Sequence, residues 1–196
     1  MSKNTTAVHV SHEAIGKIGG IGAVLEGLFT SSTYNSEVER SILVCPLFTT
    51  EGSVSTRLGP DSEVLYSSLD GVNKTNYYPS FHRIEEQFNV NIIYGRRTFH
   101  DKRHDVKSSP EIVLIDVSGI DQAPINRLKS AFFQEFGICS DKYEHIWDYE
   151  QWLRLGPPAV EIIKSIGAAN PAGETIIFAH EYMGMPTALT AKLDLS

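Results

Sequence analysis

The sequence SILVCPL at residues 41–47 decides the fold, because it is an almost unbroken apolar run followed by polar residues 49–55. A run of this kind predicts a strand that is buried on both faces, as in a parallel sheet. The sequence EIVLIDV at residues 111–117 has the same character, and TIIFA at residues 175–179 is a third candidate strand. Amphipathic stretches alternate with these runs. We therefore expect an α/β fold of the Rossmann-like kind, with a mostly parallel sheet and helices on both faces.

Three segments are expected to interrupt this regular alternation. Residues 49–78 are rich in Gly, Ser, Asn, Thr and Asp and predict an irregular excursion from the parallel core, such as a hairpin. The basic residues 95–109 predict a loop. Pro157 and Pro158 predict a stop between two helices, and Pro186 predicts the first turn of a terminal helix, because proline lacks the N–H that a helix interior uses.

Composition and charge exclude several classes of protein. The chain has 196 residues, with 17 Lys and Arg against 24 Asp and Glu, and a formal net charge of −7. We expect one domain over residues 1–196 that binds neither nucleic acid nor an anionic membrane, because both would repel an acidic protein. Cys45 and Cys139 are too few for a disulfide framework, and no signal peptide or membrane span is visible. These features predict a cytoplasmic protein.

The most informative loop is glycine-rich and lies between the first expected strand and the first expected helix. Residues 12–25 read HEAIGKIGGIGAVL. Glycines at the carboxyl end of a parallel strand let the backbone approach a ligand, and the N–H groups of the following helix attract an anion. Lys17 would add a charge-assisted hydrogen bond to a phosphate, worth roughly 1.5–3 kcal/mol. The alternative is a turn whose glycines only permit tight packing of strand against helix.

The glycine spacing departs from two familiar nucleotide-binding motifs. The dinucleotide fingerprint would need glycine at position 25, where Leu25 stands, and residues 45–48 hold no acid for a ribose. The P-loop pattern fails because no Gly-Lys-Ser/Thr sequence occurs. A nicotinamide-binding oxidoreductase domain is therefore a disfavoured alternative.

Three segments carry a resemblance to a known family. The sequence KIGGIG at residues 17–22 resembles the K-x-G-G-[LI]-G turn near the start of glycogen and starch synthases. The sequence FAHEYMGM at residues 178–185 resembles the family's H-x-H-[DE]-W segment, and VLIDVSG at residues 113–119 resembles its strand ending in F-D-I-G-S. The order and the distances agree. The chain is thus similar to the amino-terminal half of a GT-B glycosyltransferase.

The resemblance implies retaining transfer of glucose from UDP-glucose or ADP-glucose to an α-1,4-glucan. It assigns Lys17 to the donor diphosphate, Gly19 and Gly20 to the turn that approaches the phosphates, and His180 to the transfer site beside the donor sugar. It also implies that neither a metal nor a cofactor is needed. Lys and helix N–H groups stabilise the charge that the leaving diphosphate gains in the transition state.

Neighbouring residues are further candidates for the same cleft. His12 and Glu13 flank the glycine turn and would line the cleft or lie in solvent. Glu181 is a candidate acid or base, although an acid at a helix start also complements the helix dipole. Tyr182 stands where the family has Trp, and Phe178 stands where it has the first His. Both departures bear on specificity for the sugar and the acceptor.

Members of the resembled family continue into a carboxy-terminal domain that supplies most contacts to the nucleotide. We therefore expect this chain to be an incomplete amino-terminal GT-B domain that does not turn over alone. The alternative in another class is a catalytically inactive GT-B-like domain that binds a glucan or a protein partner. The basic residues 96–104 would meet phosphates or a glucan surface, or would simply be solvated.

Overall fold

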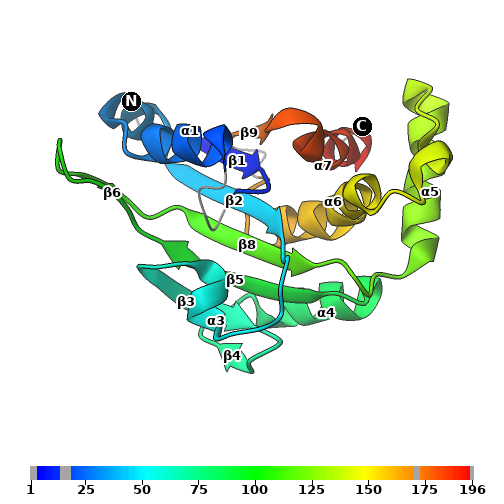
Figure 1. The fold of residues 1–196 in the computed structure, drawn as a ribbon, viewed down its shortest axis with the longest axis horizontal. Helices are drawn as coiled ribbons and strands as arrows, with labels where there is room; N and C mark the ends of the chain where they lie inside the picture. Colours follow the sequence, from blue (N-terminus) through cyan, green and yellow to red (C-terminus); the bar gives the residue numbers. More distant parts are fainter. Residues whose placement is uncertain (1–3, 14–18, 170–172, 195–196) are drawn as a thin grey trace.

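The sheet at the centre of the molecule is mixed. In the computed structural model, which describes residues 4–13, 19–169 and 173–194, seven of the strands pair in the order β4-β3-β5-β8-β2-β1-β9 (Figure 1). These strands are β1 (Thr5–Val10), β2 (Arg40–Pro46), β3 (Ser62–Ser67), β4 (Val72–Asn73), β5 (Asn91–Arg97), β8 (Glu111–Asp116) and β9 (Glu174–Ala179). Strands β8, β2, β1 and β9 pair in parallel, while β4, β3, β5 and β8 pair antiparallel.

Helices cover both faces of this sheet, so the expected α/β layering is confirmed. One face packs against α1 (Gly20–Phe29) and α3 (Val54–Leu58), with α2 (Ser32–Glu37) beside them. The other face packs against α4 (Tyr78–Phe88), α5 (Gln122–Phe136), α6 (Trp147–Ser165) and α7 (Glu181–Asp194), with the 3-10 turn η1 (Ser140–Tyr143) between α5 and α6. The alternation along β2 shows why: Ile42 and Val44 contact one layer, and Leu43 and Cys45 contact the other.

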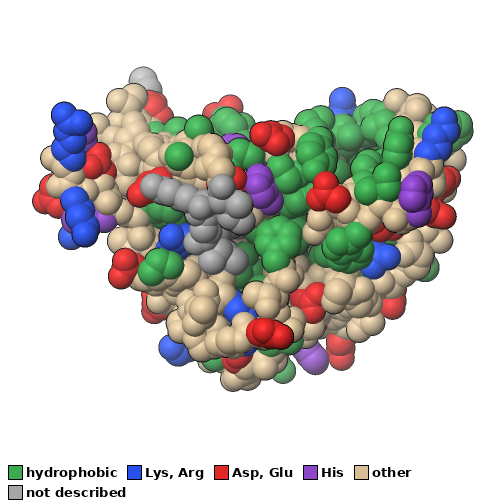
Figure 2. Space-filling view, viewed as in Figure 1, with side chains coloured by type: hydrophobic (Ala, Val, Ile, Leu, Met, Phe, Trp, Pro, Cys, Tyr) green, Lys and Arg blue, Asp and Glu red, His purple; other side chains and the backbone are tan. Residues whose placement is uncertain are grey.

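Residues 95–97 end β5 and residues 99–108 form a β-ribbon, so the expectation of a loop over residues 95–109 was wrong. Strands β6 (Phe99–Asp101) and β7 (Val106–Ser108) pair antiparallel and project from the sheet between β5 and β8 (Figure 1). The turn is held locally, because Asp101 accepts hydrogen bonds from the N–H of Arg103 at 2.8 Å and from Nδ1 of His104 at 2.6 Å. Figure 2 shows Lys, Arg and His side chains gathered at this projecting end.

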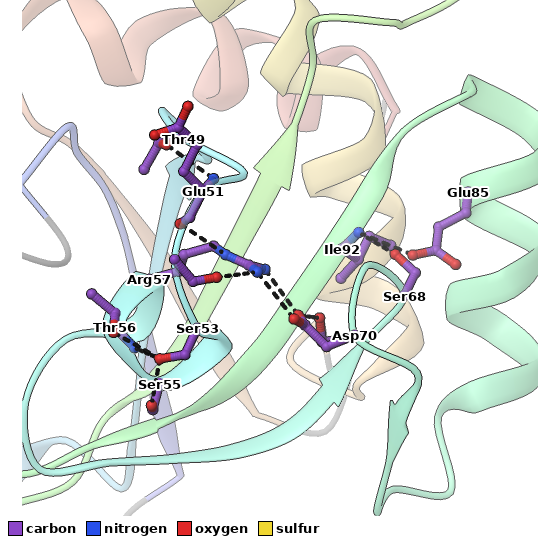
Figure 3. A network of polar contacts seen from close by, with 12 residues as sticks. Thr49, Glu51, Ser53, Ser55, Thr56, Arg57, Ser68, Asp70, Glu85 and Ile92 are labelled. Carbon is purple, nitrogen blue, oxygen red and sulfur yellow. Dashed lines mark hydrogen bonds and ion pairs between the residues drawn. The ribbon is translucent and has the colours of Figure 1, made fainter.

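The segment 49–78 contains α3 and the antiparallel pair β3–β4, and it is held by a buried arginine (Figure 3). Arg57 donates to both carboxylate oxygens of Asp70, at 2.8 and 3.0 Å, and to the carbonyl of Gly52 at 2.8 Å. The hydroxyl of Ser67 also donates to Asp70. The Arg57 guanidinium lowers the pKa of Asp70, so the loop before α3 is tied to the β3–β4 turn by a charged pair.

The prolines of the carboxyl-terminal part lie inside helices, and two expectations were therefore wrong. Helix α6 continues through Pro157 and Pro158, and α7 begins at Glu181, so Pro186 is not in its first turn. The two helices pack tightly against each other in this region. A Cβ at Gly156 would lie 2.6 Å from Oγ1 of Thr190, so glycine there allows α6 and α7 to pack closely across the prolines.

Candidate functional site

A crevice of about 720 Å³ lies where β1 and β9 end and α1 and α7 begin. This is the edge of a parallel sheet at which ligands of α/β proteins bind. The crevice is lined by His12, Glu13, Gly19, Gly20, Ile21, Val24, Asp148, His180, Glu181, Tyr182 and Met183. It brings together the candidate residues of the glycine turn and of the segment after the last strand. Lys17 lies outside the described residues.

The approach of α7 to the sheet depends on a glycine in its first turn. A Cβ at Gly184 would lie 2.5 Å from Cα of Ala179 and 2.9 Å from the carbonyl oxygen of Val10. The backbone N–H of His180 donates to that same Val10 oxygen at 3.0 Å. Glu181 has a φ of 57°, a left-handed conformation that is costly for a residue with a side chain. The bend presents residues 180–183 to the crevice.

Glu13 caps helix α1. Its carboxylate accepts a hydrogen bond of 2.6 Å from the N–H of Gly22 and lies 3.2 Å from Nε2 of His12. The side chain is buried, and a Cβ at Gly19 would lie 3.0 Å from its Oε1. Glu13 was expected to line the cleft or to lie in solvent, and a role as a helix cap was not expected. The structure shows that its negative charge lies at the helix N-terminus, where an anionic ligand would otherwise bind.

Behind His180 lies a second histidine, His9, which sequence reasoning missed. Nδ1 of His9 is 3.0 Å from Nε2 of His180, and Nε2 of His9 is 2.9 Å from the hydroxyl of Tyr34. The Tyr34 hydroxyl lies 2.9 Å from Oγ of Ser41. His9 is only 1% exposed. The available signal was the sequence AVHV at residues 7–10, because a lone polar ring in a buried strand requires a hydrogen-bond partner.

Both rings of this pair are neutral near pH 7. Burial, with a smaller contribution from His180, lowers the pKa of His9 to about 3, and burial also lowers the pKa of His180. Nε2 of His180 is used by His9, so Nδ1 is the ring nitrogen left for a ligand. Nδ1 of His12, on the opposite wall of the crevice, is buried and has no hydrogen-bond partner among the described residues.

Tyr182 closes the crevice on the side of α6. Its hydroxyl donates to Oδ2 of Asp148 at 2.7 Å, and this hydrogen bond raises the pKa of the phenol. Asp148 was not among the expected residues. Among the described lining residues the acidic side chains are Glu13, Asp148 and Glu181, and none is Lys or Arg. A polyanion therefore needs a cation from elsewhere in order to bind here.

The rim of the crevice exposes apolar side chains. Val24 and Tyr182, which line it, are 62% and 54% exposed, and Phe178 and Met185, close in sequence to the lining residues His180 and Met183, are also exposed. Val24 faces away from the core, whereas Leu25 and Phe29 of the same helix are buried. Figure 2 shows hydrophobic side chains gathered over the α7 region of this face. Such a rim is suited to a ligand with an apolar face.

The basic run lines a separate hollow of about 530 Å³ between α1 and the β6–β7 ribbon. Its cationic residues are Arg97, Lys102 and Lys107, and Glu13 lines both this hollow and the crevice. Arg97 also lies over the ring of Phe99, 4.9 Å from its centre. The structure thus places the basic run beside the crevice rather than within it.

The described residues hold no group of three or more His, Cys, Asp or Glu side chains arranged to bind a metal ion. Of the helices in the described ranges, none has the length and apolar character needed to cross a membrane. No protein-family model matches the chain, and a search of curated proteins found no match. The case for a function therefore rests on the chemistry of the crevice.

Proposed function

We propose that this chain is the amino-terminal domain of a retaining glycosyltransferase of the glycogen and starch synthase kind. The observation that supports this proposal is the shared crevice of the glycine turn and His180. Gly19 precedes α1 and Gly20 begins it, whereas His180 follows a strand more than a hundred residues later. The resemblance requires these two segments to face one ligand.

Under this proposal the donor diphosphate lies at the start of α1. The N–H groups of Gly20 and Ile21 occupy the first two helical positions, where no intrahelical acceptor exists. Glu13 already accepts from the third, Gly22, and its charge opposes a diphosphate. Lys17 would provide the cation that the described lining lacks. Together these groups would stabilise the diphosphate as the bond between its oxygen and C1 of glucose breaks.

His180 would lie beside the donor sugar. Its ring is neutral and half-buried, so it can form a hydrogen bond with a sugar hydroxyl without attracting the diphosphate to the wrong position. The glucan acceptor would lie on the exposed apolar rim, where aromatic side chains suit the faces of glucose rings. Its hydroxyl oxygen would form the new bond to C1 on the side from which the diphosphate leaves, and the hydroxyl proton would pass to the departing diphosphate oxygen. The same proposal places the protein in the cytoplasm, in keeping with Cys45 and Cys139, which form no disulfide in the described part of the chain.

The test is transfer of labelled glucose from UDP-glucose or ADP-glucose to glycogen, with the chain expressed in its full reading frame. We expect Lys17→Ala to reduce turnover strongly and His180→Ala to abolish transfer while circular dichroism and the melting temperature are preserved. His82→Ala, an exposed histidine of α4 outside the crevice, is the matched control. Wild-type rates in both crevice variants would refute the proposal.

The second candidate is a binding domain of the same fold without transferase activity. It is favoured by the Glu13 carboxylate, which occupies an amide that a phosphate would use. In this case maltoheptaose, or a protein partner, would bind at the apolar rim, and the transfer assay would give no product with either donor. A nicotinamide-binding domain has less support, because Leu47 and Phe48 follow β2 where an acidic residue would hold the ribose.

A further inference from the structure

We propose that His9 is a positioning residue that decides which ring nitrogen of His180 carries the hydrogen. The hydrogen bonds behind it run from the crevice through the buried His9 ring to the half-buried hydroxyls of Tyr34 and Ser41. The inference rests on the proposed function only where it says which substrate group contacts His180. The hydrogen-bond pattern itself can be tested without any substrate.

The sheet register places the two rings together. His9 on β1 pairs with Phe178 on β9, so His180 lies one residue beyond the strand, on the same face as His9. Aromatic neighbours hold the His9 ring in place: Phe178 stacks on it at 4.8 Å with an interplanar angle of 8°, and Phe29 meets it edge-on at 5.3 Å. The ring is therefore rigid, and Phe178, at the position of the family's first His, packs against it.

A neutral imidazole has one N–H and one lone pair, so the two hydrogen bonds of His9 are coupled. If Nδ1 of His9 accepts from Nε2 of His180, then Nε2 of His9 must donate to Tyr34. If Tyr34 instead donates to His9, then His9 must donate to His180. The hydroxyls of Tyr34 and Ser41 both donate and accept, so they allow either direction. The hydrogen bonds therefore all run in one direction. In the inward arrangement His180 donates to His9 and His9 donates to Tyr34, and in the outward arrangement Tyr34 donates to His9 and His9 donates to His180.

The intrinsic chemistry of imidazole favours the inward direction. A neutral histidine prefers the hydrogen on Nε2, and only the inward arrangement gives both His180 and His9 this form. His180 then has a lone pair on Nδ1, the nitrogen left for the crevice. A lone pair accepts from a hydroxyl group and does not bind a phosphate oxygen. The ligand group that His180 recognises is therefore a hydroxyl, as in the sugar of a donor.

Proton uptake by His180 would preserve the arrangement. A proton that binds Nδ1 leaves the Nε2–H bond to His9 in place, and His9 stays neutral because burial keeps its pKa near 3. The ionisable groups that line the crevice around His180 are His12, Glu13, Asp148, Glu181 and Tyr182, and the one that contacts His9 from α2 is Tyr34. Tyr34 itself has a pKa raised by burial, so it remains a neutral hydroxyl.

The test is long-range ¹H–¹⁵N NMR of the histidine rings in the 196-residue chain without ligand. We expect His180 of the wild type to carry its hydrogen on Nε2. In Tyr34→Phe the Nε2–H of His9 would lose its acceptor, and a buried unpaired donor is costly. His9 should then donate from Nδ1, which moves the hydrogen of His180 to Nδ1 in most molecules. Tyr143→Phe, an exposed tyrosine of η1, is the matched control and should change nothing.

His9→Phe is the second variant, since it retains an aromatic ring in the stack and removes both hydrogen bonds. We expect His180 to exchange between its two tautomers in this variant. A wild-type His180 protonated on Nδ1, or the same single tautomer in wild type, Tyr34→Phe and His9→Phe, would overturn the inference.

The transfer assay separates this inference from the proposed function. If transfer occurs, His9→Phe should lower kcat about tenfold or more with little change in KM, because a misplaced reacting group slows the chemical step. His9→Asn, whose amide can replace Nδ1 towards His180, should restore part of that loss. Tautomer changes without any glucose transfer would refute the transferase and leave the positioning role intact. Glucose transfer with unchanged tautomers would support the transferase and refute the positioning role of His9.

Discussion

The carboxylate of Glu13 accepts a hydrogen bond of 2.6 Å from the backbone N–H of Gly22, the third residue of α1. An acidic side chain of the glycine-rich loop thus lies at the N-terminus of the helix that follows the loop. Any phosphate at the same place must contend with this charge. The pair therefore links the stability of α1 to the binding properties of the crevice.

Removing the charge of Glu13 should make the crevice a better anion site. Glu13→Gln keeps an oxygen that accepts from Gly22 and loses the negative charge, so we expect tighter binding of inorganic pyrophosphate by isothermal titration calorimetry. Glu13→Ala also removes the cap and should lower the free energy of unfolding by about 1 kcal/mol. An unchanged pyrophosphate affinity in Glu13→Gln would show that this carboxylate does not control anion binding.

A methyl group at position 184 should destabilise the protein. The Cβ of Gly184→Ala would lie 2.5 Å from Cα of Ala179, which is backbone and cannot move aside, so α7 must shift. We expect a loss of about 1–3 kcal/mol in urea unfolding, as for other overpacked sites. Gly27→Ala is the matched control, because a Cβ there meets nothing within 4 Å in the exposed middle of α1. The control should gain about 0.5–1 kcal/mol, and equal stability of the two variants would contradict the prediction.

The Arg57–Asp70 pair should make stability depend on pH in the acidic range. Arg57 lowers the pKa of Asp70 from the ordinary 3.8, so the stabilisation is present above that value and declines as the pH falls through the lowered pKa. Arg57→Ala should therefore destabilise the protein clearly at pH 7 and much less near pH 2. Urea unfolding at the two pH values measures this difference, with the exposed Arg83→Ala as control. A deficit that is equal at both pH values would assign the effect to packing alone.

Burial of His9 should reduce stability as the solution becomes acidic. The folded-state pKa is about 3 against an ordinary 6.5, so below pH 6.5 the unfolded chain binds a proton that the folded chain excludes. The loss begins near pH 6.5, grows as the pH falls and amounts to a few kcal/mol at most, on the order of the full shift. The variant His9→Phe should show a flatter decline in unfolding free energy between pH 6.5 and 4. His82→Ala should retain the wild-type slope, and a wild-type slope in His9→Phe would count against a buried neutral ring.

Local patterns were sufficient for the elements of the core. The apolar runs at residues 41–47 and 111–117 became β2 and β8, because a strand covered on both faces needs apolar side chains at nearly every position. The ribbon at residues 99–108 escaped this reasoning, since it is largely exposed and is held by side chain to backbone bonds such as that of Asp101. The predictions made from the prolines of α6 and α7 were wrong for a related reason. Local propensity predicts a helix stop, and packing around Gly156 overrides it.

The sequence by itself determined the alternation of strands and helices and singled out the glycine turn, because burial and backbone freedom leave a signal within a few residues. His180 became a candidate only through the resemblance of residues 178–185 to a family segment. Only the tertiary structure decided that these two segments line one crevice, that Glu13 occupies the start of α1 and that His9 supports His180. These relationships depend on β1 and β9 lying side by side. Pairing between strands so distant in the chain is a property of the whole packed sheet, and no local pattern encodes it.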